Sequence, residues 1–418
     1  MRAFAVLTVA LVATSLCALG GCKRTPEPLI LEKPGVADAP QTPPVPGPRR
    51  AHDVHAHLSP LSYPVATQFM DESGLQRVVN MSGGNGREYI LQNLAAADQA
   101  GQRIALFYNL DWSGIDEPGF GQERAQEFTW AIAQGYGGLK ISKALGLGVK
   151  TADGKLLAVD DERLDPIWQT AGKHGVVVGI HTSDPKAFFE KPGPQNERHK
   201  ELSHAPSWSF YGPDFPSRNE LLAARDRMIA RNPGTTFLLL HFANNPEDIE
   251  YVDALLKKHP NLVIDVAARL GEFGRHEASR VRKFFVDHQD RILFATDIML
   301  TVQPYKGQMA YSLTLGSISE KRPTLDDIKP FYDLHWKYFE SSEAAIDHPV
   351  PIQGDWQVHP LALEADVLDK LYFKNAERII FAPWLARRAA STVGQTAQQL
   401  AAASSDGSKA AVVEAGAN

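Results

Sequence analysis

The feature that most constrains the fold of this chain is a regular alternation of short apolar runs and amphipathic helical stretches. Such alternation is typical of parallel βαβ units, and continuous apolar runs suit strands that are buried on both faces. The eight runs are Ala51–His57, Arg77–Ser82, Arg103–Leu110, Gly138–Ser142, Val176–His181, Thr235–His241, Leu262–Ala267 and Ile292–Asp297. Eight units predict an α/β fold and, within that class, a (β/α)8 TIM barrel. An open, doubly wound parallel sheet is the alternative.

Two connections in this pattern are much longer than the others. Residues 182–234 follow the fifth run, and residues 298–360 follow the eighth. Connections of this length are usually either functional covers or disordered segments. Their aromatic side chains, which include Trp208, Trp336 and Trp356, favour ordered insertions that shape the mouth of the barrel.

The beginning of the chain has the pattern of a secretory signal. A positive Arg2 precedes an apolar run, and the segment ends in Leu19-Gly20-Gly21-Cys22, which resembles the cleavage box of bacterial lipoproteins. We therefore expect residues 1–21 to be a lipoprotein signal peptide. Cys22 would then be the lipidated first residue of the mature chain. An ordinary cleaved signal with an incidental cysteine is the alternative.

The segments that flank the eight units differ from them in composition. Eight of residues 23–50 are proline, which predicts an extended tether over residues 22–50. Lys23, directly after the cysteine, resembles the pattern of lipoproteins sorted to the outer membrane, so we expect the bacterial cell envelope, at the periplasmic face of that membrane or at the cell surface. Residues 389–418 are rich in alanine and predict a disordered tail. The folded domain is expected at 51–388.

Charge and cysteine content narrow the classes of function. The formal net charge of −6 excludes a nucleic-acid binder that relies on bulk positive charge. The only cysteines, Cys17 and Cys22, lie in the first 22 residues, so the domain has no thiolate ligand, cysteine nucleophile or disulfide. A metal site must therefore use His, Asp, Glu or a modified Lys.

Histidine and aspartate side chains stand at or near the ends of four of the runs. His55 and His57 are two positions apart, so in a strand they point to the same side. The fifth, sixth and eighth runs end in His181, His241 and Asp297. In a barrel these ends face one mouth, where imidazoles and a carboxylate form a site for a divalent metal. Each residue taken singly has an ordinary structural explanation, but the whole set in barrel order predicts a metal centre.

Several segments together resemble the amidohydrolase superfamily, and most closely its branch that includes aminocarboxymuconate-semialdehyde decarboxylase. They are Asp53-Val54-His55-Ala56-His57-Leu58-Ser59-Pro60, Gly138-Leu139-Lys140-Ile141, Gly179-Ile180-His181, Leu240-His241-Phe242-Ala243, Phe294-Ala295-Thr296-Asp297 and the late stretch Leu371–Arg378. The resemblance covers about residues 51–385. Its His-x-His start and its late Asp are characteristic of the superfamily but not of one substrate.

The resemblance implies a role for each residue of the set. His55, His57, His181 and Asp297 would bind a divalent metal, with Zn²⁺ first and Mn²⁺ or Fe²⁺ as alternatives. His241 would lie beside the metal and orient the nucleophile or polarise the scissile group. A metal such as Zn²⁺ lowers the pKa of water that it binds, and Asp297 could take the proton and pass it to a leaving group.

Four further residues are expected near the mouth. Lys140 has three readings: a carboxylated bridge between two metals, an unmodified contact to a substrate carboxylate, or a structural salt bridge. Arg269 follows the seventh run and either binds a carboxylate in a bidentate manner or holds a loop. Asn109 and Asp111 follow the third run and are expected substrate contacts.

The resemblance implies an enzyme, and two reactions remain open. The first is a metal-dependent hydrolase that uses metal-activated water on an amide, lactone or ester of a small molecule. The second is a metal-dependent non-oxidative decarboxylase, a lyase, on the same scaffold. A surface-binding lipoprotein without turnover is the third interpretation. The expected partners are a carbonyl- or carboxylate-bearing small molecule and, through the lipid anchor, a membrane, with no nucleic acid.

Overall fold

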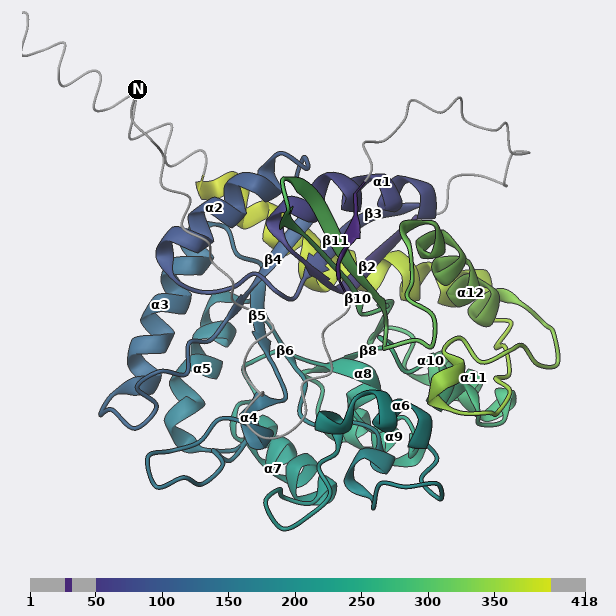
Figure 1. The fold of residues 1–418 in the computed structure, drawn as a ribbon. Helices are drawn as coiled ribbons and strands as arrows, with labels where there is room; N and C mark the ends of the chain where they lie inside the picture. The colour runs from purple at the N-terminus through teal and green to yellow at the C-terminus, as the bar shows by residue number, and fades with distance from the viewer. Residues whose placement is uncertain (1–26, 32–49, 392–418) are drawn as a thin grey trace, which may run out of the picture.

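Every strand of the computed structural model belongs to one curled, mixed sheet (Figure 1). The structure describes residues 27–31 and 50–391. Within them the strands are β1 (Leu29–Ile30), β2 (Ala51–Leu58), β3 (Leu75–Asn80), β4 (Ile104–Asn109), β5 (Gly138–Ile141), β6 (Val177–Ile180), β7 (Phe237–Leu239), β8 (Leu262–Asp265), β9 (Ile292–Leu293), β10 (Ile298–Tyr305) and β11 (Gln308–Leu315). Their order in the sheet is β1-β11-β10-β2-β3-β4-β5-β6-β7-β8-β9.

The eight predicted runs correspond to β2 through β9. Each of these strands pairs in parallel with the next one along the chain. The α/β prediction is therefore confirmed. β3 through β9 end before the predicted runs do, and in β6 and β7 the chain turns away before the polar residues His181 and His241. β2 instead continues one residue past its predicted run, to Leu58.

The chain after β9 returns to the first strand of the parallel series. The amide of Val54 in β2 donates to the carbonyl of Phe294 at 3.1 Å, and the amide of Asp297 donates to the carbonyl of His55 at 2.8 Å. The buried carboxylate of Asp53 strengthens this junction, since it accepts hydrogen bonds from the Thr296 and Tyr332 hydroxyls at 2.5 and 2.7 Å. These bonds place Asp297 beside His55.

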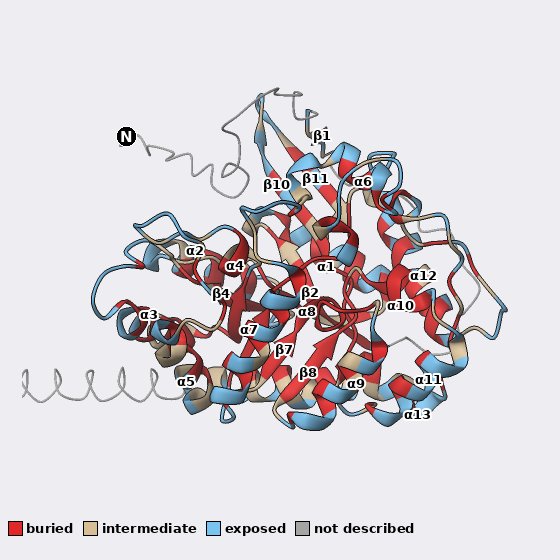
Figure 2. Ribbon diagram, turned by 90° about the horizontal axis from the view of Figure 1, so that it is seen from below, coloured by how far each residue is buried: buried red, intermediate tan, exposed pale blue. Residues whose placement is uncertain are grey.

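Helices cover the outer face of the sheet (Figure 1). The longer ones are α1 (Tyr63–Ser73), α2 (Arg87–Asp98), α3 (Phe120–Gln134), α5 (Asp165–His174), α7 (Arg218–Arg231), α9 (Ile249–Lys258), α11 (Ala278–Asp287) and α12 (Ile328–Glu340). The shorter ones are α4 (Ala144–Leu147), α6 (His199–His204), α8 (Leu240–Ala243), α10 (Leu270–Gly274) and α13 (Ala365–Asp369). In Figure 2 the parallel strands such as β4, β7 and β8 are buried, and exposed residues lie on the outer helices, the loops and the β10–β11 hairpin. Within the described residues, no helix combines the length and apolar character needed to cross a bilayer.

Both long connections contain regular structure in the described chain. The first, 182–234, holds α6 and α7, and the second, 298–360, holds the β10–β11 hairpin and α12. The hairpin extends the sheet beside β2, because Ile298 and Leu300 of β10 pair in parallel with Ala56 and Leu58.

The flanking segments enter the structure only in part. Leu29–Ile30, within the predicted tether, forms β1 and pairs antiparallel with β11. The C-terminal helical segment runs through Phe381 and Trp384 to Ser391, three residues into the predicted tail. The predicted signal peptide, Cys22 and residues 392–418 lie outside the described residues.

Candidate metal centre

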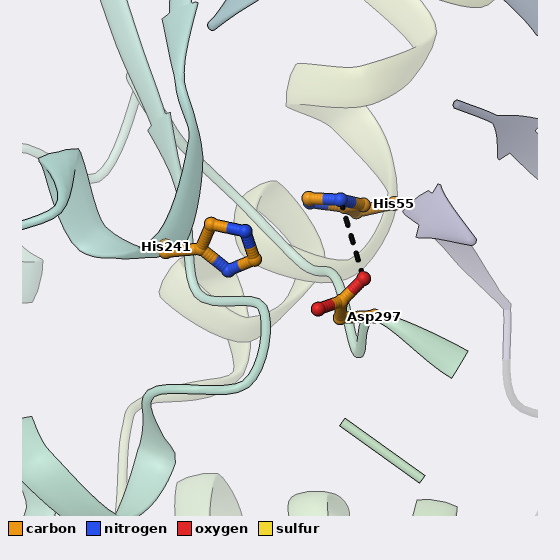
Figure 3. A group of neighbouring side chains, drawn as sticks. All are labelled: His55, His241 and Asp297. Atoms are coloured by element: carbon orange, nitrogen blue, oxygen red, sulfur yellow. Dashed lines mark ion pairs between the residues drawn. The ribbon is translucent and has the colours of Figure 1, made fainter. Parts of the chain in front are cut away.

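Three buried side chains from distant parts of the chain meet at the carboxyl ends of the parallel strands (Figure 3). They are His55 of β2, His241 of the turn after β7, and Asp297 before β10. Each offers a ligand atom, and these atoms all lie within 4.8 Å of one another. The Nε2 atom of His55 is 3.4 Å from Oδ1 of Asp297, and its ring centre is 4.8 Å from that of His241.

A second histidine of β2 approaches the same carboxylate oxygen. The Nε2 atom of His57 lies 3.4 Å from Oδ1 of Asp297, while its Nδ1 contacts the Ser82 hydroxyl at 2.6 Å. Oδ1 of Asp297 is buried and has no hydrogen-bond partner. A buried carboxylate oxygen without a partner is costly, and two imidazole nitrogens beside it are the donor set that a divalent metal takes. The residues therefore fit a metal ion.

A backbone irregularity helps to aim the histidines of β2. Asp53 and Ala56 pair with Val78 and Asn80 of β3, so three steps along β2 match two along β3. A bulge of this kind changes which side of the strand the following side chains face. The simple two-residue alternation used for the prediction does not reveal it.

Asp265, the last residue of β8, holds both buried histidines. Its Oδ2 contacts His55 Nδ1 at 2.9 Å, and its Oδ1 accepts the amide of His241 at 2.6 Å. Because a carboxylate accepts, the proton of His55 lies on Nδ1, and the lone pair of Nε2 faces Asp297. Burial raises the pKa of Asp265, against the lowering effects of the His241 amide and Lys140.

The His241 side chain is presented by a strained turn. His241, Phe242, Ala243 and Asn244 have φ values of 56°, 56°, 56° and 53°. A left-handed conformation costs about 1–2 kcal/mol per non-glycine residue, so surrounding contacts must stabilise the turn. His241 Nδ1 lies 3.0 Å from the carbonyl of Ala267, to which it donates, and this leaves Nε2 with a free lone pair.

Burial keeps the imidazoles of the centre in the form that binds metal. It lowers the pKa of His55 and of His241 well below the ordinary value, with Lys140 acting in the same direction on His55. Burial opposes ionisation of Asp297, but the neighbouring His55, His57 and Lys140 outweigh it and hold its pKa below its usual range. Two neutral imidazoles beside a carboxylate are ligands that need not lose a proton before binding.

Lys140, on β5, lies inside the centre. Its Nζ is 3.3 Å from Nε2 of His55. Burial lowers the pKa of Lys140 to about 8, although Asp297 and Asp265 favour its charged form. A buried amine at this position can approach a bound carboxylate or carbonyl oxygen, which is one of the three interpretations of Lys140.

His181 lies next to the centre but is engaged elsewhere. Its ring centre is 4.3 Å from that of His241, and its Nε2 contacts Oδ1 of Asp184 at 3.2 Å. Asp184 also pairs with Lys143 and lies 3.6 Å from the guanidinium of Arg269. Burial lowers the pKa of His181 to about 4, although Asp184 opposes that shift.

The predicted substrate contacts have structural partners. Asn109 accepts from the amide of Gly84 at 2.7 Å and donates to the carbonyl of Met81 at 3.0 Å, so it holds the loop after β3. Asp111 lies 3.7 Å from Arg124, and its side chain is 47% exposed. Arg269 contacts Asp184 and lies 3.8 Å from Glu272.

Two residues around the centre were not predicted from the sequence. Asp265 could have been found by the rule that identified His241, since it closes the buried run Leu262–Ile264. Asp184 gave no such signal, because it lies in the long connection after β6 and not at the end of an apolar run, although it is only three residues from His181.

Comparison with solved structures gives distant similarities in fold. The 2,6-dihydroxybenzoate decarboxylase from Rhizobium is 16% identical with a TM-score of 0.43, over 80% of this chain and 98% of that one. The dihydroxybenzoic acid decarboxylase from Polaromonas sp. JS666, with bound manganese and the inhibitor 2-nitroresorcinol, is 12% identical with a TM-score of 0.42, over 79% and 96%. An amidohydrolase from Burkholderia multivorans with bound zinc is 13% identical with a TM-score of 0.39, over 80% and 99%.

Comparison at the level of sequence families is more decisive. No curated protein matches the chain. The family model described as amidohydrolase matches residues 53–381, which include every residue of the candidate metal centre. The sequence resemblance is thereby confirmed at the level of the family: the chain belongs to the amidohydrolase family.

Proposed function

We propose that the protein is a metal-dependent hydrolase that uses activated water to cleave an amide, lactone or ester bond of a small molecule. The observation that carries the proposal is the unpartnered, buried Oδ1 of Asp297, 3.4 Å from Nε2 of both His55 and His57. Membership of the amidohydrolase family supports the same class of reaction.

The proposed ligands are His55, His57, His181 and Asp297, with His241 beside the metal. His181 can join through Nε2 if that atom gives up its contact with Asp184. Imidazole and carboxylate ligands suit Zn²⁺, Mn²⁺ or Fe²⁺, and Zn²⁺ is the first choice. A divalent metal supplies Lewis acidity, which polarises a carbonyl group and activates water.

The remaining steps fall to the protein's own side chains. Asp297 takes a proton from the attacking water and passes it to the leaving group. His241 keeps its proton on Nδ1, so the lone pair of its Nε2 is free to orient the attacking water. Lys140 binds a substrate carboxylate or stabilises developing negative charge; a carboxylated form bridging two metals and a structural ion pair are the alternatives. Arg269, Asn109 and Asp111 are proposed to shape the substrate side of the mouth.

A non-oxidative decarboxylase is the second candidate reaction. The observation that favours it is Lys140 Nζ, a buried amine 3.3 Å from His55 Nε2, which suits a substrate that carries a carboxylate into the centre. The substrate panel should therefore contain amides, lactones and esters on one side and aromatic carboxylates on the other. Formation of a carboxylic acid product identifies the hydrolase, and release of carbon dioxide identifies the decarboxylase.

The direct test of the centre is Asp297→Asn. An amide is a poor ligand and no base, so metal content should fall from one or more ions per chain to near zero and turnover should be lost. The thermal unfolding midpoint of the metal-free variant should lie within a few degrees of that of the metal-free wild type. Metal content and activity equal to wild type would refute the proposal.

Two further variants separate the proposed ligands from the positioning histidine. His181→Ala should weaken binding of Zn²⁺ or Mn²⁺, the metals named in two of the similar structures. His241→Ala should retain most of the metal and lose turnover. If instead His241→Ala loses the metal while His181→Ala keeps it, the two roles are exchanged, as the grouping of His241 with His55 and Asp297 would explain.

We further propose that the parallel strands close into a (β/α)8 barrel and that Cys22 carries a lipid anchor in the bacterial cell envelope. The bonds from Val54 to Phe294 and from Asp297 to His55 support closure, since they join the last part of the parallel series to its first strand. The Leu19-Gly20-Gly21-Cys22 sequence supports the anchor.

A further inference from the structure

Two arginines from the first long connection form hydrogen bonds with the strained turn at His241. Arg218 and Arg225 are seven residues apart in α7 (Arg218–Arg231), so both side chains lie on one face of that helix. Arg225 is fully buried and Arg218 is 9% exposed. Buried guanidinium groups are uncommon unless their donors are used, and their partners therefore indicate what the pair does.

Both arginines donate hydrogen bonds to backbone carbonyls of the turn. Nη1 of Arg225 donates to the carbonyl of Ala243 at 2.6 Å, and Nη2 of Arg218 donates to the carbonyl of Asn244 at 2.8 Å. These residues are the third and fourth of the four consecutive left-handed residues that begin at His241. Hydrogen bonds to charged donors are the stronger kind, and here they stabilise a backbone conformation that its own residues disfavour.

Each guanidinium is itself held in place. Arg225 donates to Asp226 at 2.9 Å and to the Tyr251 hydroxyl at 3.0 Å. Arg218 donates to Glu247 at 2.7 Å and to the carbonyl of Asp184 at 3.1 Å. Since the Asp184 carboxylate contacts His181, Arg218 connects the two mouth histidines that come from different strands.

We propose that Arg218 and Arg225 are positioning residues that keep the His241 imidazole in one orientation and one tautomer at the metal centre. α7 is thus a support of the site. The proposal rests on the function proposed for His241 only for its effect on turnover. Its structural part, the state of the His241 ring, can be measured without a substrate or a metal.

The experiment is nitrogen NMR of imidazole-labelled protein, with the His241 signals assigned by their loss in His241→Asn. In wild type, Nδ1 should carry the proton, because it donates to the Ala267 carbonyl. In Arg225→Gln and in Arg218→Gln the turn loses a clamp. The two nitrogen signals of His241 should then move toward the average of the two tautomers. Arg225→Lys, which keeps a charged donor, should restore part of the wild-type pattern.

A matched control lies on the same helix. Arg227 pairs with Asp160 at 2.7 Å, and its side chain is 62% exposed. Arg227→Gln should therefore leave the His241 signals unchanged. Tyr251→Phe removes only a hydroxyl that orients Arg225, so it provides a mild variant if the Gln variants do not fold, and it should move the signals in the same direction by less. Unchanged His241 signals in the folded variants of Arg218, Arg225 and Tyr251 would overturn the proposal.

Kinetics give the second readout once a substrate is found. A misdirected catalytic group lowers kcat by about 10- to 100-fold with little change in KM. If the signals move as expected but wild type with Zn²⁺ or Mn²⁺ turns over no compound of the panel, the positioning role stands and the proposed function fails. If wild type is active and the variants keep its signals and kcat, the function stands and the positioning role is wrong.

Discussion

Asp265 is the residue on which both buried histidines of the centre depend, although it is not itself a proposed ligand. One of its oxygens orients the His55 ring, and the other accepts the amide that begins the His241 turn. It is completely buried, so solvent cannot replace either bond. Partners of this kind commonly fix the tautomer and direction of metal-binding imidazoles.

We therefore expect Asp265→Asn to weaken the affinity for Zn²⁺ by about 10- to 100-fold, the usual effect of removing such a partner. An amide can accept the His241 amide proton, but its NH2 group then faces the Nδ1 proton of His55 and repels it. Titration against a chelating dye measures the affinity.

The matched control is Asp253→Asn. Asp253 contacts His288 at 2.8 Å, an aspartate–histidine pair away from the centre. This variant should bind metal like wild type. Equal affinities for wild type and Asp265→Asn would show that Asp265 does not orient the ligands.

At the scale of elements, α12 packs an aromatic face against the end of the parallel series. Trp336 stacks on Phe294 with ring centres 4.5 Å apart, and Tyr332 donates to Asp53. His335 lies in the same cluster, fully enclosed, and its Nδ1 donates to the carbonyl of Phe331 at 2.8 Å. A helix from the second long connection thereby supports the junction that places Asp297.

The buried His335 predicts a pH-dependent loss of stability. Burial lowers its pKa from 6.5 to about 4 in the folded state. Above pH 6.5 the residue is neutral in both states and has no effect. As the pH falls from 6.5 to 4, the unfolded chain binds a proton that the folded chain does not, and the free energy of unfolding drops by about 3 kcal/mol at about 1.4 kcal/mol per pH unit.

His335→Asn keeps a donor for the Phe331 carbonyl and removes this titration. Between pH 7.5 and pH 5, urea unfolding should show a smaller loss of stability in the variant than in wild type, by about 2 kcal/mol. Other buried histidines titrate in both proteins and cancel in the difference. If the free energy of unfolding fell equally with pH in wild type and in His335→Asn, the lowered pKa of His335 would not be the cause.

A second prediction at this scale concerns the contact between the two long connections. Arg198, fully buried, pairs with Glu201 of α6 at 2.8 Å and with Glu272 of α10, and Ser317 donates to Glu201 at 2.5 Å. Arg198→Met leaves the buried carboxylate of Glu201 without its cation and leaves Glu272 with only the more distant Arg269, at 3.8 Å. The expected cost is about 3–5 kcal/mol of unfolding free energy, measured in urea.

Arg163→Met is the control for that substitution. Arg163 pairs with Asp161 at 2.8 Å on the surface, where such pairs contribute about 1 kcal/mol or less. A cost for Arg198→Met no greater than that of Arg163→Met would mean that the connections are held together by other contacts.

At the scale of the whole molecule, the sheet continues from the parallel strands into the hairpin and the N-terminal segment. β11 pairs with β10 on one side and with β1 on the other. Glu27, just before β1, accepts from Lys306 at the hairpin turn at 3.0 Å. The chain that follows the proposed signal is thus attached to the domain at a point far in sequence from β2.

The proposed anchor predicts where the protein is found in the cell. Cys22→Ser should move the protein from the membrane fraction to the soluble fraction, because acyl chains on Cys22 would be its attachment. Cys17→Ser, in the predicted signal, should stay with the membranes. Fractionation and immunoblotting provide the measurement, and a Cys22→Ser protein that still sediments with membranes would exclude this anchor.

The local pattern of the sequence was sufficient for the eight parallel strands and for the residues at their ends. Period and burial are encoded in neighbouring residues, and parallel strands of one series end on the same side. The prediction that His55, His241 and Asp297 lie close together depended on nothing else, and the structure brings them within 4.8 Å.

What only the tertiary structure decided is how those side chains are aimed and what holds them. The bulge in β2 and the left-handed turn at His241 are held by segments far apart in sequence, whereas the Asp184 contact of His181 spans three residues and depends on how the loop after β6 turns. The hydrogen bond that Asp265 accepts from the His241 amide and those that Arg218 and Arg225 donate to the turn offset the cost of its conformation, and no local pattern specifies such bonds. The periodicity of the sequence thus determined which residues lie at the site, whereas long-range packing determined how their side chains are oriented.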